Sequence, residues 1–315
     1  MGNLRTIKGL YIKHVSSDPS NLVEGDIWYN TTTQTLKTAP LIGAWASGGD
    51  LNTGRYGGGG GGATQSVGWC AGGRDGPGSD VALSEEYDGS SWTEGNNLTN
   101  ARRYTAGFGP QTAAIIAGGY TTTNLGHTEE YDGTNWSEQN NLNSARRNHG
   151  TAGTSAAGLA VGGSDDAVRA YSEEYDGSSW AEGNDLGTGR SSTAACGTQT
   201  AALLCCGHPN STAIEEYNGT SWTAGTACNT GRHGHASFGT QTAGAVFGST
   251  GNDASGYESW NGSSWTDESD MTVARGYTAG CGTTSAVAVF HGNPGAIATT
   301  EEFTKSVTAR SVDTT

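Results

Sequence analysis

The chain has 315 residues, of which 16 are lysine or arginine and 31 are aspartate or glutamate, so its formal net charge is −15 at pH 7. This acidic balance disfavours nucleic acid as a partner, because phosphate binding needs clustered lysine and arginine. The 52 glycines argue against a helical fold, and no run approaches the ~18 apolar residues of a membrane span, so we expect no membrane insertion. The N-terminus lacks the apolar core of a secretory signal.

Residues 1–40 lie outside the repeat that fills most of the chain. They read as an extended arm followed by a hairpin, with strands at 26–30 and 36–38 and a turn at 31–34. We therefore divide the chain into an N-terminal arm and hairpin at 1–40, a repeat region at 41–305 and a C-terminal tail at 306–315.

One pattern recurs from Trp45 onward. A tryptophan is followed six residues later by leucine, cysteine or methionine, and four residues after that by arginine. Self-similarity at a period of 42 to 47 residues indicates a repeat architecture. The tryptophans are Trp45, Trp92, Trp136, Trp180, Trp222 and Trp265, and the arginines are Arg55, Arg102, Arg146, Arg190, Arg232 and Arg275.

Each unit divides into four short strands. In the second unit they are expected at 102–108, 112–117, 128–131 and 136–138. The third and fourth strands are joined by Asp-Gly or Asn-Gly, which supplies the positive φ angles of a tight hairpin turn. The second strand is a continuous apolar run, as expected where neighbouring units cover both of its faces. Four strands per unit of ~40–50 residues are typical of a propeller blade.

Counting the strands predicts how the ring closes. Six pairs of first and second strands follow the six arginines, and the last unit has a third strand at 301–303 without a following tryptophan. The strand at Trp45 has no preceding partners, so we expect it to complete the last blade and remove the exposed sheet edge. The predicted fold is all-β, a six-bladed β-propeller closed by its N-terminal strand.

The order of residues in each unit resembles the kelch repeat. In the second unit this order is Gly118-Gly119, Glu130-Tyr131-Asp132, Trp136, Leu142 and Arg146. The resemblance covers about residues 45–303. It departs from the pattern where Trp260 and Phe303 replace the tyrosine, and we place two further departures at Gly207-His208 and Gly248-Ser249, which lack the second glycine.

The six repeated arginines have two interpretations. They could form a ring that binds an anion or a glycan, or each could pair with the glutamate of the repeated Glu-Glu-Tyr. We favour the second, because an unpaired buried arginine is costly and the glutamate recurs beside it.

The sequence does not favour metal or enzyme chemistry. His149 and His235 occupy the same repeat position, and His233 could share a strand face with His235, but the pattern fixes no third ligand. Kelch propellers include copper radical oxidases, which need histidines, tyrosines and a cross-linked cysteine that break the repeat. Here the tyrosines and the six cysteines follow the repeat, the cysteines as small apolar residues. We therefore expect no enzyme activity, cofactor, metal or disulfide.

Candidate binding residues lie in the irregular loops between second and third strands. Loops on a rigid scaffold carry binding specificity, and these loops should share one face of the ring. The candidates are Arg74, Asp75, Tyr120, Asp165, Asp166, Arg169 and His208.

The segment DPSNLVEGDIWYNTTTQTLKT, ahead of glycine- and threonine-rich blades, resembles virion proteins of tailed bacteriophages, especially marine ones. The resemblance implies a tail fibre or a capsid- or tail-attached decoration protein of the extracellular particle, assembled in the host cytoplasm. Residues 1–40 would dock on other virion proteins, and the propeller would bind a host-surface glycan or protein. The alternatives are a secreted or surface lectin-like propeller and a kelch-type copper oxidase. Oligomerisation is compatible with each.

Overall fold

The computed structural model describes residues 12–312, and every regular element in this range is a β-strand. The predicted all-β class is therefore confirmed. The chain divides into two compact units, one made of the described residues before Trp45 and after Phe303, the other of residues 45–303. In the part that the structure describes, no helix is long and apolar enough to span a membrane.

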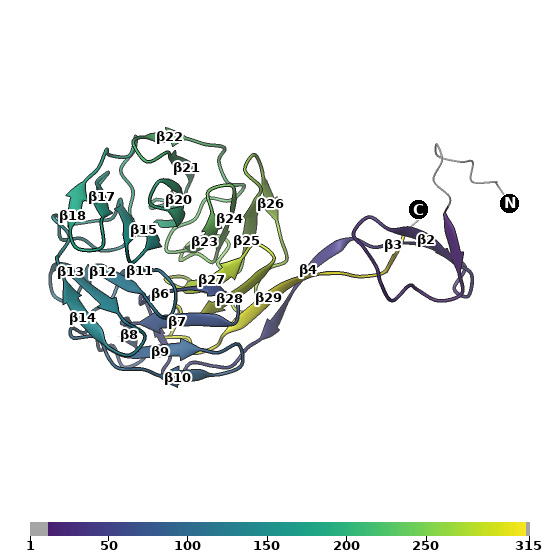
Figure 1. Ribbon diagram of the computed structural model, residues 1–315, viewed down its shortest axis with the longest axis horizontal. Helices are drawn as coiled ribbons and strands as arrows, with labels where there is room; N and C mark the ends of the chain where they lie inside the picture. Colours follow the sequence, from purple (N-terminus) through teal and green to yellow (C-terminus); the bar gives the residue numbers. More distant parts are fainter. Residues whose placement is uncertain (1–11, 313–315) are drawn as a thin grey trace. The chain divides into compact units, whose positions relative to one another are not determined.

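Residues 45–303 form a ring of four-stranded sheets around a central axis (Figure 1), and each sheet is one blade of the propeller. The first strand of each blade lies nearest the axis. From inside to outside the blades are β6 (Gly59–Thr64), β7 (Val67–Ala71), β9 (Ser84–Tyr87) and β10 (Trp92–Glu94); β11 (Ala106–Phe108), β12 (Ile115–Tyr120), β13 (Asn124–Tyr131) and β14 (Trp136–Gln139); β15 (Gly150–Thr154), β16 (Ala157–Val161), β17 (Ser172–Tyr175) and β18 (Trp180–Glu182); β19 (Ala194–Thr198), β20 (Ala201–Gly207), β21 (Ser211–Tyr217) and β22 (Trp222–Ala224); β23 (Ala236–Thr240), β24 (Ala243–Phe247), β25 (Tyr257–Trp260) and β26 (Trp265–Asp267); β27 (Ala279–Thr283), β28 (Ala286–Phe290), β29 (Glu301–Val307) and β4 (Leu41–Ser47).

The last blade takes its outer strand from the N-terminal side of the chain, because β4 lies beside β29. A two-stranded sheet, β5 (Arg55–Tyr56) with β8 (Arg74–Asp75), adds to the first blade. The innermost strands begin later than the sequence predicted. β11 starts at Ala106 rather than at Arg102, because Tyr104 has a φ of 55° that interrupts an extended strand.

The innermost strands are rich in glycine because they converge on the axis. A Cβ added to Gly60 would lie 2.8 Å from the Cβ of Ala279 in another blade. The glycine run at 57–62 is therefore needed for close packing. The second strands are apolar and buried between blades; Ile115 and Ile116, for example, have no exposed surface.

A ring of main-chain hydrogen bonds joins the blades around the axis. The residue two positions after each repeated arginine has a positive φ, and its N–H donates to the carbonyl of the equivalent residue in the preceding blade. The N–H of Gly57 donates to the Tyr277 carbonyl at 2.9 Å and joins the first blade to the last. At the same junction the Gln65 side chain donates to the carbonyls of Val287 and Phe303, both at 2.9 Å.

Each repeated arginine forms a buried ion pair with a glutamate on the third strand of its own blade. This glutamate is the first residue of Glu-Glu-Tyr in four blades, of Glu-Ser-Trp at Glu258 and of Glu-Glu-Phe at Glu301. Arg146 lies 2.6 Å from Glu173, and both side chains are almost fully buried. The same glutamate accepts a hydrogen bond from the N–H of Asn143, at 2.7 Å, in the segment that enters the blade. The other pairs are Arg55–Glu85, Arg102–Glu129, Arg190–Glu215, Arg232–Glu258 and Arg275–Glu301.

The smaller unit is a four-stranded sheet in the order β1 (Lys13–Val15), β2 (Ile27–Asn30), β3 (Thr35–Thr38) and β30 (Arg310–Ser311). The hairpin predicted from the sequence is β2 with β3. Asp18 organises it by accepting hydrogen bonds from Trp28 at 3.0 Å and Asn30 at 2.8 Å. These bonds, led by the one from Asn30, lower the pKa of Asp18, and Trp28 is only 2% exposed.

The expected C-terminal tail at 306–315 is not a separate segment where the structure describes it. β29 continues to Val307, and β30 pairs with β3. Without β30, one edge of β3 would have unpaired main-chain N–H and C=O groups, and the C-terminal residues form hydrogen bonds with these groups. Residues 1–11 of the predicted arm and residues 313–315 of the predicted tail lie outside the described residues.

Deleting residues 1–40 should leave the ring folded, because β4 begins at Leu41. Deleting residues 1–48 also removes Trp45, whose ring centroid lies 5.3 Å from that of Phe303. We expect this longer deletion to lower the melting temperature by about 10 °C or more, measured by circular dichroism. If the protein that lacks residues 1–40 did not fold, the division into two units would be refuted.

Replacing Arg102 by methionine should destabilise the protein by about 3–5 kcal/mol in urea unfolding at pH 7, because Glu129 would stay buried without its cation. Adding Glu129→Gln to this variant removes the remaining buried charge and should restore part of the lost stability. If the free energy of unfolding of the Arg102→Met variant were within about 1 kcal/mol of the wild-type value, the result would contradict the stabilising role of the pair.

Candidate functional site

A cavity of about 110 Å³ opens on the ring axis. Its rim is formed by the residue two positions after each repeated arginine, and we call these six residues the channel mouth. A second cavity of about 360 Å³ shares six lining residues with the first, one small residue from the innermost strand of each blade, and we call these six the waist. The channel mouth consists of Gly57, Tyr104, Asn148, Ser192, Gly234 and Tyr277, and the waist of Gly60, Gly107, Thr151, Ala195, Ser237 and Gly280.

The main-chain groups of the channel mouth are already used. All six N–H groups and all six carbonyls take part in the ring of hydrogen bonds between blades, at distances from 2.5 to 3.0 Å. All six residues have φ between 49° and 67°. The backbone of the channel mouth is thereby fixed, and only its side chains can contact a ligand.

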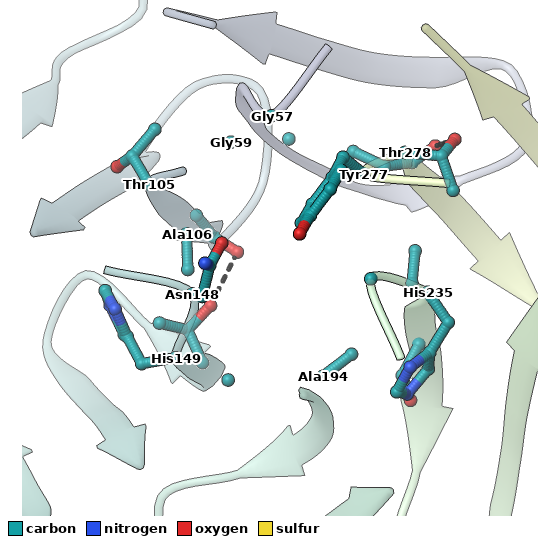
Figure 2. Close-up of a pocket in the computed structure, with 18 of the residues that line it drawn as sticks. Gly57, Gly59, Thr105, Ala106, Asn148, His149, Ala194, His235, Tyr277 and Thr278 are labelled. Atoms are coloured by element: carbon teal, nitrogen blue, oxygen red, sulfur yellow. Dashed lines mark hydrogen bonds between the residues drawn. The ribbon is translucent and has the colours of Figure 1, made fainter. Parts of the chain in front are cut away.

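Two tyrosines meet on one side of the channel mouth. The ring centroids of Tyr104 and Tyr277 are 5.0 Å apart, and Gly57 lies between them in the ring of blades. A Cβ on Gly57 would lie 3.0 Å from the Tyr104 ring. Glycine at this position therefore makes room for the tyrosine pair. Figure 2 shows the Tyr277 side chain extending into the opening.

The other side of the channel mouth is polar. Asn148 lies across the opening from Tyr277 (Figure 2), and Ser192 follows it in the next blade. Within residues 12–312, the side chains of Asn148, Ser192 and Tyr277 form no hydrogen bond. The described residues that line the two cavities include no Asp, Glu, Lys or Arg. The opening therefore combines an aromatic surface with free, uncharged hydrogen-bonding groups.

Three histidines are buried just below the channel mouth. His149 and His235 line the first cavity, and Figure 2 shows their rings turned away from the opening. His291 is buried in the slot where the second blade has Gly118, and has a φ of 48°. Burial, with Arg146 nearby, lowers the pKa of His149 to about 3; burial also lowers the pKa of His235 and of His291 to about 3. All three are neutral at pH 7.

The two-histidine metal site considered from sequence does not have the expected geometry. His233 and His235 precede β23 and are separated by Gly234 at a φ of 62°, so they do not share a strand face. The Nδ1 atom of His233 instead contacts the Asn210 side chain at 2.5 Å. Among residues 12–312 there is no group of three or more His, Cys, Asp or Glu that could hold a metal ion.

The glycine register predicted for the fourth blade was shifted by one residue. His208 bonds to Ser191 as Tyr120 bonds to Arg103, so the glycine pair of other blades corresponds to Cys206-Gly207 and not to Gly207-His208. The first glycine of the pair is therefore replaced by Cys206, and the second glycine is present as Gly207. The same alignment reveals His291 in the last blade, which sequence reasoning missed.

All six cysteines are free and buried.

The predicted loop residues lie next to the channel mouth. In main-chain β-pairing, Arg74 lies opposite Tyr56, Tyr120 opposite Arg103 and His208 opposite Ser191. Tyr56, Arg103 and Ser191 each directly precede a residue of the channel mouth. These loops therefore share the face on which the first cavity opens. Asp75 holds its own loop by accepting hydrogen bonds from the N–H groups of Gly78 and Ser79. Asp165 pairs with Arg169 at 2.6 Å.

Tyr120 lies close to two guanidinium groups that sequence reasoning missed. The centroid of its ring is 4.9 Å from Arg103 and 4.5 Å from Arg147. Each arginine also pairs with a carboxylate, Arg103 with Asp80 at 2.5 Å and Arg147 with Asp166 at 3.1 Å. The available signal was the doubled arginine at 102–103 and 146–147, where only the first member belongs to the repeat.

Comparison with known proteins shows the fold. No protein-family model matches the chain, and no curated protein matches it. A solved structure titled "Structure of YjhT" matches with a TM-score of 0.67 and 11% sequence identity, over 83% of this chain and 99% of that one. The chain therefore has the β-propeller fold. The kelch resemblance stays a prediction, since identity this low shows the fold alone.

Lowering the pH from 7 should destabilise the protein through the buried histidines. Their pKa values are depressed by folding, so the unfolded chain binds protons below pH 6.5 that the folded chain does not bind until about pH 3. The contribution of these neutral histidines to the free energy of unfolding is fully present above pH 6.5. It decreases towards pH 3 by about 1.4 kcal/mol per pH unit for each histidine.

Urea unfolding at pH 7 and pH 5 tests this dependence. The matched variant is His149→Thr with His235→Thr, because Thr105, Thr193 and Thr278 hold the same slot in other blades. We expect a smaller loss of stability at pH 5 in the variant than in the wild type. Equal losses would show that these histidines do not cause the dependence.

Proposed function

We propose that this protein is a non-enzymatic structural protein of a bacteriophage virion, a tail fibre or a capsid- or tail-attached decoration, whose propeller binds the host surface. The observation that carries the proposal is the channel mouth. There a hydrogen-bonded backbone ring presents two tyrosines, and the polar side-chain groups of Tyr277, Asn148 and Ser192 form no hydrogen bond with other described residues. Preformed openings lined by aromatic groups and a few polar groups are typical of binding sites.

The chemistry of the channel mouth favours binding over catalysis. General acid–base catalysis at neutral pH needs a group whose pKa lies near 7. The histidines that line the first cavity, His149 and His235, have pKa values of about 3, and the described lining residues include no carboxylate. A copper site of the oxidase type would need histidine nitrogens directed at one point, whereas these two rings turn away from the opening (Figure 2).

The smaller unit supports a role in attachment to other virion proteins. Four of the six exposed large apolar side chains of the described chain belong to it: Val23, Ile27, Leu41 and Val312. Exposed apolar groups concentrated in this small unit favour docking on a partner. Together with the resemblance of the arm to virion proteins, this favours the virion over the second candidate, a secreted or surface lectin-like propeller, which the tyrosine pair alone would equally support.

Cryo-electron microscopy of particles that carry the protein tests this proposal. We expect propeller-shaped density at the tail, its fibres or the capsid, with residues of the smaller unit against another virion protein. Purified wild-type protein should also compete with the particles for adsorption to host cells. A protein absent from the particles would contradict the virion role, and an incorporated protein that never competes would contradict host-surface binding.

A further inference from the structure

We propose that the channel mouth binds the neutral terminal sugar ring of a glycan, with the sugar against Tyr104 and Tyr277 and its hydroxyls on Asn148 and Ser192. The inference rests on the proposed host-surface binding and names its ligand class and its site. Four properties of the opening support it: its charge, its hydrogen-bonding groups, its aromatic surface and its size.

The charge of the site selects an uncharged ligand. The described lining residues include no Asp, Glu, Lys or Arg, and the nearby histidines are neutral at pH 7. Residues 45–303 contain ten arginines and no lysine, and all of these arginines except Arg74 form ion pairs. Arg74 is not among the residues that line either cavity. A carboxylate or phosphate entering the opening would therefore lose hydration without meeting an unpaired cation in the lining, which is unfavourable.

The free hydrogen-bonding groups match sugar hydroxyls. Asn148 offers a carbonyl oxygen and an amide nitrogen, and the hydroxyls of Ser192 and Tyr277 can each donate and accept. A sugar hydroxyl has the same dual capacity, so one ring can satisfy groups of both kinds. The main-chain groups at these positions cannot take this role, since they are bonded to the neighbouring blades.

The tyrosine pair supplies the apolar surface that a sugar ring also needs. The rings of Tyr104 and Tyr277 are tilted by 51° and are partly exposed. Tyrosine presents an apolar body with a polar tip, which suits a ligand that has C–H groups on one face and hydroxyls at its edge. Tyr56 extends the aromatic surface, with its centroid 6.3 Å from that of Tyr104.

The size of the opening limits how much of the glycan it holds. Its volume of about 110 Å³ is well below the roughly 300–1,000 Å³ of pockets that enclose a drug-sized molecule. The opening therefore takes one end of the ligand. The rest of the glycan would pass over the loops that carry Tyr120 and His208, which lie beside the channel mouth.

The chain itself supplies a safe substitution. Gly57 and Gly234 hold the equivalent position in two blades, with φ of 67° and 62°, so glycine fits this backbone without strain. We therefore choose Tyr277→Gly and Asn148→Gly as test variants. Gln34→Gly is the control, since Gln34 also has a positive φ, 57°, but belongs to the other unit.

Binding is measured on an array of neutral and acidic saccharides, with the full-length protein and each variant at equal concentration. We expect the wild type to bind saccharides with a neutral terminal hexose or N-acetylhexosamine. Tyr277→Gly and Asn148→Gly should each weaken this binding about tenfold, while Gln34→Gly should not. Thermal melting checks that all variants are folded.

The outcomes separate this inference from the proposed function. Binding only to acidic saccharides, to none, or equally by wild type and both channel-mouth variants would overturn the neutral-sugar site. Adsorption to host cells that is abolished by protease and resists periodate would also overturn it and identify a protein receptor, while leaving host-surface binding intact. Failure of the wild type to adsorb to any host surface would instead remove the proposed function on which the inference rests.

Discussion

The structure depends on one buried ion pair that recurs in every blade. The repeated arginine begins the innermost part of a blade, and its glutamate lies on the third strand and also accepts an N–H from the incoming segment. Each pair thus joins three parts of a blade at one buried point. Because a buried charge without its partner costs several kcal/mol, the repeat cannot change one member alone. This explains why both residues recur while much of the blade varies.

The same anchoring leaves the neighbouring positions free to vary. Two residues beyond the arginine, the backbone is fixed by its φ and by hydrogen bonds to both neighbouring blades, whatever side chain is present. Gly, Tyr, Asn and Ser all occur there. One residue further on, threonine and histidine fill the slot in five blades, and glycine does so in the first. A repeat with an invariant frame can therefore carry a non-repeating binding surface at its axis.

The sequence predicted the fold better than the site. The spacing of Trp45, Leu51 and Arg55 and of their counterparts was sufficient for the propeller, because packing requires a tryptophan, an apolar residue and an arginine at these positions in every blade. The channel mouth was missed because its members share a position and not a residue type, and ring hydrogen bonds leave no signal in sequence. His291 was missed because it stands in a glycine slot. β30 was missed because a two-residue strand has no periodic pattern.

The central claim is that a hydrogen-bonded ring displays an uncharged, tyrosine-lined opening that binds a ligand at the propeller axis. A crystal structure of the full-length protein soaked with a neutral oligosaccharide tests it most directly. The account predicts density for one sugar ring against Tyr104 and Tyr277, with Asn148 in hydrogen-bonding contact. Sugar density confined to the loops around Tyr120 and Asp166, with an empty opening, would contradict it.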